Sequence, residues 1–157
     1  VRGRANGFTL IELVITVAIL AVLVSAAVPL AEVTRVRAKE SELRSALRTL
    51  REAIDAYKRA ADEGRVQRAA DETGYPRSLE ALVNGVPDAK NPGRRQLYFL
   101  RRIPGDPFAD PDTPAAATWA KRSYASSPES PQEGRDVFDV YSRSTARGLN
   151  GIPYNQW

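Results

Sequence analysis

Residues 7–19 read GFTLIELVITVAI, and this stretch decides how the rest of the chain is organised. It opens an apolar run over residues 8–31, and no comparable run follows. The residues that interrupt the run are Thr9, Glu12, Thr16, Ser25 and Pro29. A helix of this length would reach roughly 36 Å, which is enough to cross the hydrocarbon core of a bilayer. The sequence therefore predicts a hydrophobic transmembrane or assembly helix near the N-terminus.

The residues around this run allow more than one interpretation. Arg2 and Arg4 precede it, so the positive-inside rule places the short head inside and the bulk of the chain outside. The small residues at 25–27 are also compatible with a cleaved secretory signal. Glu12 argues against a signal, because a carboxylate at mid-helix costs about 2.5–3.5 kcal/mol and a signal peptide gains nothing from it. A functional subunit whose Glu12 meets a cation, a cleaved signal and a plain anchor all stay open on the residues alone.

The composition narrows the possible chemistry. The 157 residues suffice for one modest domain plus an extension, and they include no Cys and no His. Disulfides and thiolate metal sites are thereby excluded, and the usual general base and commonest zinc ligand are missing. Asp106 and Asp110 are the nearest pair for carboxylate-based catalysis, but their proline-rich loop favours a role as turn formers. We expect no catalytic residue.

A second class of function is a nucleic-acid-binding module. The net charge is +4, without a dense block of Lys and Arg. The one basic stretch with aromatic residues has Tyr98 and Phe99 between the pairs at 94–95 and 101–102. We expect both aromatic side chains in the core and therefore no nucleic-acid partner.

An amphipathic pattern follows the hydrophobic run. Apolar residues recur at spacings of 4, 3, 4 and 3 and define one stripe, formed by Leu43, Leu47, Leu50, Ile54 and Tyr57. Charged residues such as Arg44 and Arg51 fall off this stripe. The stripe is too short for a coiled coil, so we expect it to pack against a small sheet of the same chain. Gly64 suits the C-terminal cap, which gives a continuation of the helix over residues 32–64.

The pattern of residues 65–157, which follow the helix, predicts a globular C-terminal domain, here called the head. Pro76 opens a short helical stretch over 77–83, whose buried face would be Leu79, Leu82 and Val83. Residues 118–124 and 136–142 are typical of strands, and the polar loop 126–134 between them favours an antiparallel pair. The predicted fold class is α+β.

The first motif resembles the processing site of type IV prepilins and type II secretion pseudopilins over residues 7–13. The resemblance implies that a prepilin peptidase cuts between Gly7 and Phe8, so that residues 1–7 are a leader and Phe8 becomes an N-methylated terminus. It also implies that Glu12, four residues later and on the same side of a helix, meets the free amine of a neighbouring subunit during assembly. Pro29 matches the proline at which such helices bend.

The head resembles the major pseudopilins of type II secretion systems. The matching stretches are GYP at 74–76, LEALV at 79–83, LRRIPGDPF at 100–108, FDVYS at 138–142 and Trp157. The resemblance implies a type IV pilin-like fold and a helical homopolymer that works with other pseudopilins and an inner-membrane assembly platform. The chain would be a single-pass protein of the bacterial inner membrane, with its head in the periplasm. The alternative is a type IV pilin or minor pilin that acts in adhesion, motility or DNA uptake.

The sequence departs from this family in one respect. The resemblance implies a calcium ion bound by acidic residues after the last strand, and calcium needs several oxygen ligands, usually with carboxylates among them. Residues 143–157, RSTARGLNGIPYNQW, contain no Asp and no Glu. Asn150 and Asn155 would add oxygens but no charge. We therefore expect neither a cofactor nor a metal.

Overall fold

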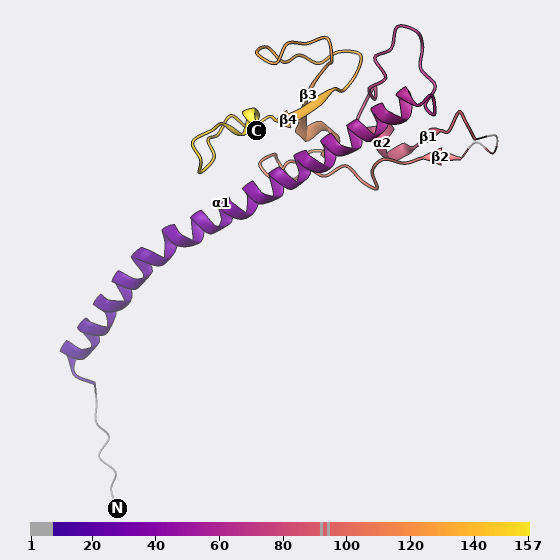
Figure 1. Ribbon diagram of the computed structural model, residues 1–157. Coiled ribbons are helices and arrows are strands. Elements are labelled where there is room, and N and C mark those ends of the chain that lie inside the picture. The colour runs from indigo at the N-terminus through magenta and orange to yellow at the C-terminus, as the bar shows by residue number, and fades with distance from the viewer. Residues whose placement is uncertain (1–7, 92, 94) are drawn as a thin grey trace, which may run out of the picture. The chain divides into compact units, whose positions relative to one another are not determined.

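The computed structural model describes residues 8–91, 93 and 95–157 (Figure 1). Its contacts divide the chain into two compact units, Val1–Ala38 and Lys39–Trp157. The elements, in chain order, are α1 (Leu10–Asp62), α2 (Glu80–Asn84), β1 (Val86–Pro87), β2 (Gln96–Leu97), the 3-10 helix η1 (Ala115–Thr118), β3 (Trp119–Arg122), β4 (Asp139–Ser142) and the 3-10 helix η2 (Tyr154–Gln156). A long N-terminal helix and small antiparallel sheets confirm the predicted pilin-like α+β fold.

The core of the second unit forms around the predicted stripe of α1. Leu43, Leu47, Leu50 and Ile54 are at most 3% exposed, and Tyr57 packs against them half-buried. The head supplies the other side of this core with Leu79, Leu82, Trp119, Val137, Val140 and Tyr154. The prediction that the stripe packs against the same chain is therefore confirmed.

Helix α1 ends as its glycine predicts. Gly64 has a positive φ of 70°, which only glycine adopts at low cost. Its N–H donates to Ala61 O (3.0 Å), and the next N–H, from Arg65, donates to Ala60 O (2.9 Å). These bonds satisfy carbonyls that the last helical turn would otherwise leave without a donor.

The two predicted strands form an antiparallel pair, but each is shorter than predicted. The register pairs Trp119 with Ser142 and Arg122 with Asp139. Beyond Arg122 the ladder stops because the next backbone donors have other acceptors, and the N–H of Ser123 donates to Gln132 O (2.9 Å). The N–H of Tyr124 and the hydroxyl of Ser123 both donate to the carboxylate of Asp136.

A second antiparallel pair, β1 with β2, was not predicted, because two residues per strand give too little alternation to recognise. Next to it, Phe99 packs on Tyr57 with ring centroids 5.2 Å apart, as expected of a core residue. The expectation for Tyr98 was wrong, since its side chain is 65% exposed. Its ring lies over Gly85, where an added Cβ would come within 2.8 Å of it.

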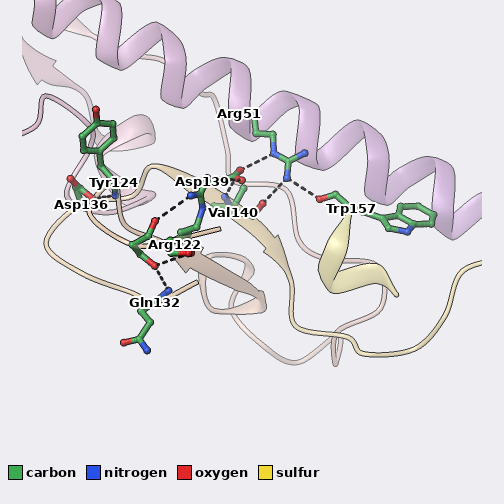
Figure 2. A network of polar contacts seen from close by, with 10 residues as sticks. Arg51, Arg122, Tyr124, Gln132, Asp136, Asp139, Val140 and Trp157 are labelled. Carbon is green, nitrogen blue, oxygen red and sulfur yellow. Dashed lines mark hydrogen bonds and ion pairs between the residues drawn. The ribbon is translucent and has the colours of Figure 1, made fainter. Parts of the chain in front are cut away.

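Polar contacts join the last strand and the C-terminus to α1 (Figure 2). Arg51 lies beside the apolar stripe and donates to the Asp139 carboxylate (2.8 Å), to Val140 O (3.2 Å) and to Trp157 O (2.9 Å). Arg51, which the sequence places on the polar face of the helix, therefore joins β4 and the C-terminus to α1.

Candidate assembly site at the N-terminus of the long helix

The first turn of α1 is capped by a threonine. Thr9 Oγ1 accepts the N–H of Glu12 (3.3 Å), and Thr9 O accepts the N–H of Leu13 (3.2 Å). This arrangement is an N-cap, so the helix begins at Leu10 and Phe8 lies just before it. The expectation that Phe8 and Glu12 share one side of a helix therefore needs correction. Glu12 stands in the first turn, and Phe8 precedes the cap.

The surface of this segment is almost entirely apolar and exposed. Within the described residues, α1 is the one helix long and apolar enough to cross a membrane, and none of its most apolar window is buried. Among the side chains from Phe8 to Leu30 that the structure describes, the large apolar ones are each at least 52% exposed: Phe8, Leu10, Ile11, Leu13, Val14, Ile15, Val17, Ile19, Leu20, Val22, Leu23, Val24 and Leu30. Such a surface requires lipid or other helices around it.

Glu12 is chemically distinct within this segment. The hydroxyls of Thr16 and Ser25 donate back to carbonyls of the preceding turn, at Leu13 O (2.8 Å) and Val22 O (2.7 Å). The segment therefore satisfies its own hydroxyl groups. The Glu12 carboxylate makes no hydrogen bond or ion pair with any residue that the structure describes. Among the described residues it is therefore a negatively charged acceptor without a partner.

The structure does not test the predicted roles of Gly7 and Pro29. Gly7 and the rest of the leader, residues 1–7, lie outside the described residues, and the cleavage site therefore remains a prediction. Pro29 lies within α1, where proline removes one backbone donor. Its role as a kink also remains a prediction.

The aspartates considered for catalysis shape the loop before η1. Asp106 is 6% exposed and accepts the N–H of Phe108 (2.8 Å) and the hydroxyl of Ser142. Asp110 accepts the N–H of Asp112 (3.0 Å). Both are turn formers, as the prolines around them indicate. Within the described residues, no three Asp, Glu, His or Cys side chains are grouped to hold a metal.

The head has a cavity of about 770 Å³, bounded by the end of α1 and by the loops around Thr73 and Asp136. Burial of Asp136 opposes its ionisation. Hydrogen bonds from Thr73, Ser123 and the N–H of Tyr124 outweigh that effect together, so the pKa of Asp136 lies below its usual value. The carboxylate is therefore ionised and engaged in holding two loops together, a structural role.

Sequence reasoning missed two kinds of residue. The Thr9 cap could have been found, because a threonine directly before an apolar periodic run is a helix-start signal. Glu40 on α1 is only 4% exposed and contacts the C-terminal segment. No local pattern distinguishes it from the exposed charges beside it.

Comparison with known proteins identifies the family of this chain. A family model described as "Prokaryotic N-terminal methylation motif" matches residues 2–28. "Type II secretion system core protein G" of Aeromonas hydrophila is 31% identical over 114 residues, which cover 70% of this chain and 72% of the relative. The proteins of the same name from Pseudomonas aeruginosa (31% over 116 residues; 70% and 72%) and Klebsiella pneumoniae (33% over 110 residues; 67% and 70%) are similar to it as well.

No solved structure matches the chain significantly. The relatives all bear the name of the secretion system, which decides against the type IV pilus alternative. With identity above 30% across more than two thirds of its length, an N-terminal methylation motif and a pilin-like fold, the chain belongs to the type II secretion system core protein G family, the structural pseudopilins of type II secretion.

Proposed function

We propose that this pseudopilin is made as a single-pass precursor in the bacterial inner membrane with its head in the periplasm. Prepilin peptidase cleaves it between Gly7 and Phe8, and Phe8 is then N-methylated. The mature chains polymerise, with other pseudopilins and an inner-membrane assembly platform, into a short periplasmic filament that helps drive proteins across the outer membrane. The family membership and the N-terminal motif support this proposal.

The observation that carries the proposal is the Glu12 carboxylate, which has no partner among the described residues and stands in the first turn of an exposed apolar helix. Leaving such a charge in lipid costs about 2.5–3.5 kcal/mol at mid-helix and less near the interface. The Coulomb attraction to a cation about 4 Å away contributes about 4 kcal/mol at an effective dielectric constant near 20. The two terms have similar size, so a neighbouring cation offsets the cost.

Cleavage supplies that cation. Removal of residues 1–7 creates a free amine on Phe8, and methylation of an amine keeps its positive charge. In one chain the amine and the carboxylate flank the Thr9 cap. In a bundle, the amine of one subunit pairs with Glu12 of the next and sets the axial register. Outside the membrane, burial of the surrounding apolar surface, at roughly 25 cal/mol per Å² removed from water, supplies the driving force for bundling.

Substitution of Glu12 tests this role. Glu12→Ala should leave cleavage and membrane insertion intact but strongly reduce filament assembly, because the amine of the neighbouring subunit loses its partner. Chemical cross-linking in intact cells measures the oligomer, and the electrophoretic shift of the precursor measures cleavage. Thr16→Ala is the matched control, since its hydroxyl bonds only to its own helix. Wild-type amounts of cross-linked oligomer in Glu12→Ala would refute the pairing.

Intact mass tests the processing step. Protein extracted from the membrane of cells that express the peptidase should lack residues 1–7 and carry one methyl group on Phe8. In cells without the peptidase the full precursor should persist. Native material that begins near Val28 would instead identify a cleaved secretory signal, and the proposal would fail.

A further inference from the structure

The C-terminal segment, residues 143–157, has little regular structure to hold it. Beyond β4 it contains one isolated β-bridge between Arg147 and Pro153 and the single-turn helix η2. It contains no Asp or Glu of its own. Its fixed position must therefore come from contacts with the rest of the head.

A buried carboxylate of α1 provides the first of these contacts. Glu40 is 4% exposed, and its Oε1 accepts the backbone N–H of Leu149 (2.6 Å) and the hydroxyl of Tyr154 (3.2 Å). Arg44, one helical turn later, lies 3.7 Å from Oε2. Charge-assisted bonds of this kind are about twice as strong as neutral ones. A charged group on the helix therefore fixes both the turn of the segment and its aromatic end.

The segment approaches Glu40 closely because of a glycine. A Cβ added to Gly148 would lie 2.6 Å from Cζ2 of Trp157 and 3.0 Å from Oε1 of Glu40. At such distances a larger side chain at this position would force the side chains of Trp157 and Glu40 to move. The turn is closed by hydrogen bonds from Gly148 N to Ile152 O (2.9 Å) and from Gly151 N to Gly148 O (2.8 Å). The chain is thus shaped to bring the N–H of Leu149 to the carboxylate.

Two arginines of the same helix hold the end of the segment. The guanidinium of Arg44 lies over the indole of Trp157, 4.3 Å from the ring centroid. Arg51 donates to the main-chain oxygen of Trp157 and also to Asp139 in β4 (Figure 2). Phe108 stacks on Tyr154 with centroids 4.0 Å apart. Charges and aromatic rings from α1 and the head therefore hold the end of the segment at Tyr154 and Trp157.

The oxygen atoms of this segment do not form a suitable ligand set for the calcium ion that the family resemblance implies. Calcium takes six to eight oxygen ligands. Main-chain oxygens of the segment already accept hydrogen bonds within the protein at Ser144, Ala146, Gly148, Gly151, Ile152, Pro153, Tyr154 and Trp157. The one buried side-chain oxygen without a partner among the described residues is the neutral amide oxygen of Asn155.

From this geometry we propose that the Glu40 carboxylate on α1 fixes the C-terminal segment through its bonds to Leu149 and Tyr154. We call this arrangement the charge clamp. It allows the head of this pseudopilin to fold and stay folded without a divalent cation. Glu40 is a positioning residue that acts on Leu149 and Tyr154. The proposal concerns the head alone and does not depend on filament assembly.

The first experiment compares thermal unfolding of the full chain in detergent, in excess EDTA and in millimolar calcium. Near-ultraviolet circular dichroism follows Trp119 and Trp157, which report on the core and on the segment. We expect the same midpoint in both buffers. A rise of several degrees with calcium would overturn the proposal.

The second experiment substitutes the carboxylate. Glu40→Gln keeps the shape of the side chain but removes the charge, and we expect a lower midpoint and faster proteolysis within residues 143–157. Glu42→Gln is the matched control, because Glu42 is exposed on the same turn. Equal behaviour of the two variants would overturn the role of Glu40. Restoration of the Glu40→Gln midpoint by calcium would show that the segment itself holds a cation and would also overturn it.

A third readout is specific to the contact with Tyr154. Burial, followed by the hydrogen bond to Glu40 and its charge, raises the pKa of Tyr154, whereas the charge of Arg44 lowers it. Titration of ¹³C-labelled tyrosines by NMR should show one resonance whose pKa falls in Glu40→Gln. That resonance is assigned by its absence in Tyr154→Phe, which keeps the aromatic stack and serves if Glu40→Gln fails to fold. An unchanged tyrosine pKa in a folded Glu40→Gln, or a wild-type midpoint in Tyr154→Phe, would contradict the clamp.

Discussion

The two compact units use the same apolar residue types in opposite ways. Leu20, in the first unit, is 59% exposed, whereas Leu50, in the second unit, is 0% exposed, although both lie on α1. In the second unit the head covers the apolar stripe of the helix. The first unit has no such cover among the described residues. One helix thus serves as the core of a fold over part of its length and as a surface for lipid or other subunits over the rest.

The largest expected effect tests the closed core of the second unit. Trp119→Ala should destabilise the head by about 3–5 kcal/mol, because it leaves a cavity at a fully buried site and removes the indole N–H that donates to Pro104 O. Denaturant unfolding followed by far-ultraviolet circular dichroism measures the loss. Membrane insertion of the precursor should be unchanged, and a simultaneous loss of insertion would contradict the independence of the two units.

The next prediction compares one substitution at two positions of the same helix. Leu50→Ala should cost about 2–5 kcal/mol of head stability, whereas Leu20→Ala should leave that stability unchanged, because its side chain lacks cover within the chain. The same denaturant titration in detergent measures both variants. Filament cross-linking should be reduced in Leu20→Ala. Equal losses of head stability would remove the distinction between the two units.

A smaller effect is expected for the arginine that fastens β4 and the C-terminus to α1. Arg51→Gln should cost about 1–2 kcal/mol, since it removes the closer of the two arginines beside the part-buried Asp139 and leaves only Arg122, 3.9 Å away. Arg48→Gln is the control, because Arg48 is exposed one turn earlier. The midpoint of thermal unfolding compares them, and an equal change in both would count against the role of Arg51.

The smallest effect is expected from acid. The pKa of Asp136 is lowered from 3.8, because the bonds from Thr73, Ser123 and Tyr124 together outweigh its burial. A lowered folded-state pKa contributes stability above the unfolded value, and this contribution is lost as the pH falls through the folded value. Head stability should therefore decline as the pH drops below about 4. The decline should be weaker in Asp136→Asn, and an identical acid profile in that variant would contradict the assignment.

Local patterns predicted the long helix α1 well, because each signal there lies within a few residues of its structural consequence, whereas the short helix predicted over 77–83 is found at Glu80–Asn84. The spacing from Leu43 to Ile54 placed the buried stripe, and Gly64 placed the end of α1. The pair of strands was also predictable, though not where it ends. The N–H of Tyr124 donates to the carboxylate of Asp136 instead of continuing the ladder, and the alternation of residues around Tyr124 does not indicate this contact.

The sequence by itself determined the apolar run, its single carboxylate and the amphipathic helix that follows, since hydrophobicity and helical spacing act over one or two turns. Only the tertiary structure decided the role of the charges. Glu40 and Arg51 resemble their exposed neighbours in the sequence, yet they lie against the C-terminal segment 109 and 106 residues away along the chain. A charge becomes a structural contact only when folding brings a donor or an acceptor to it and removes the water between them.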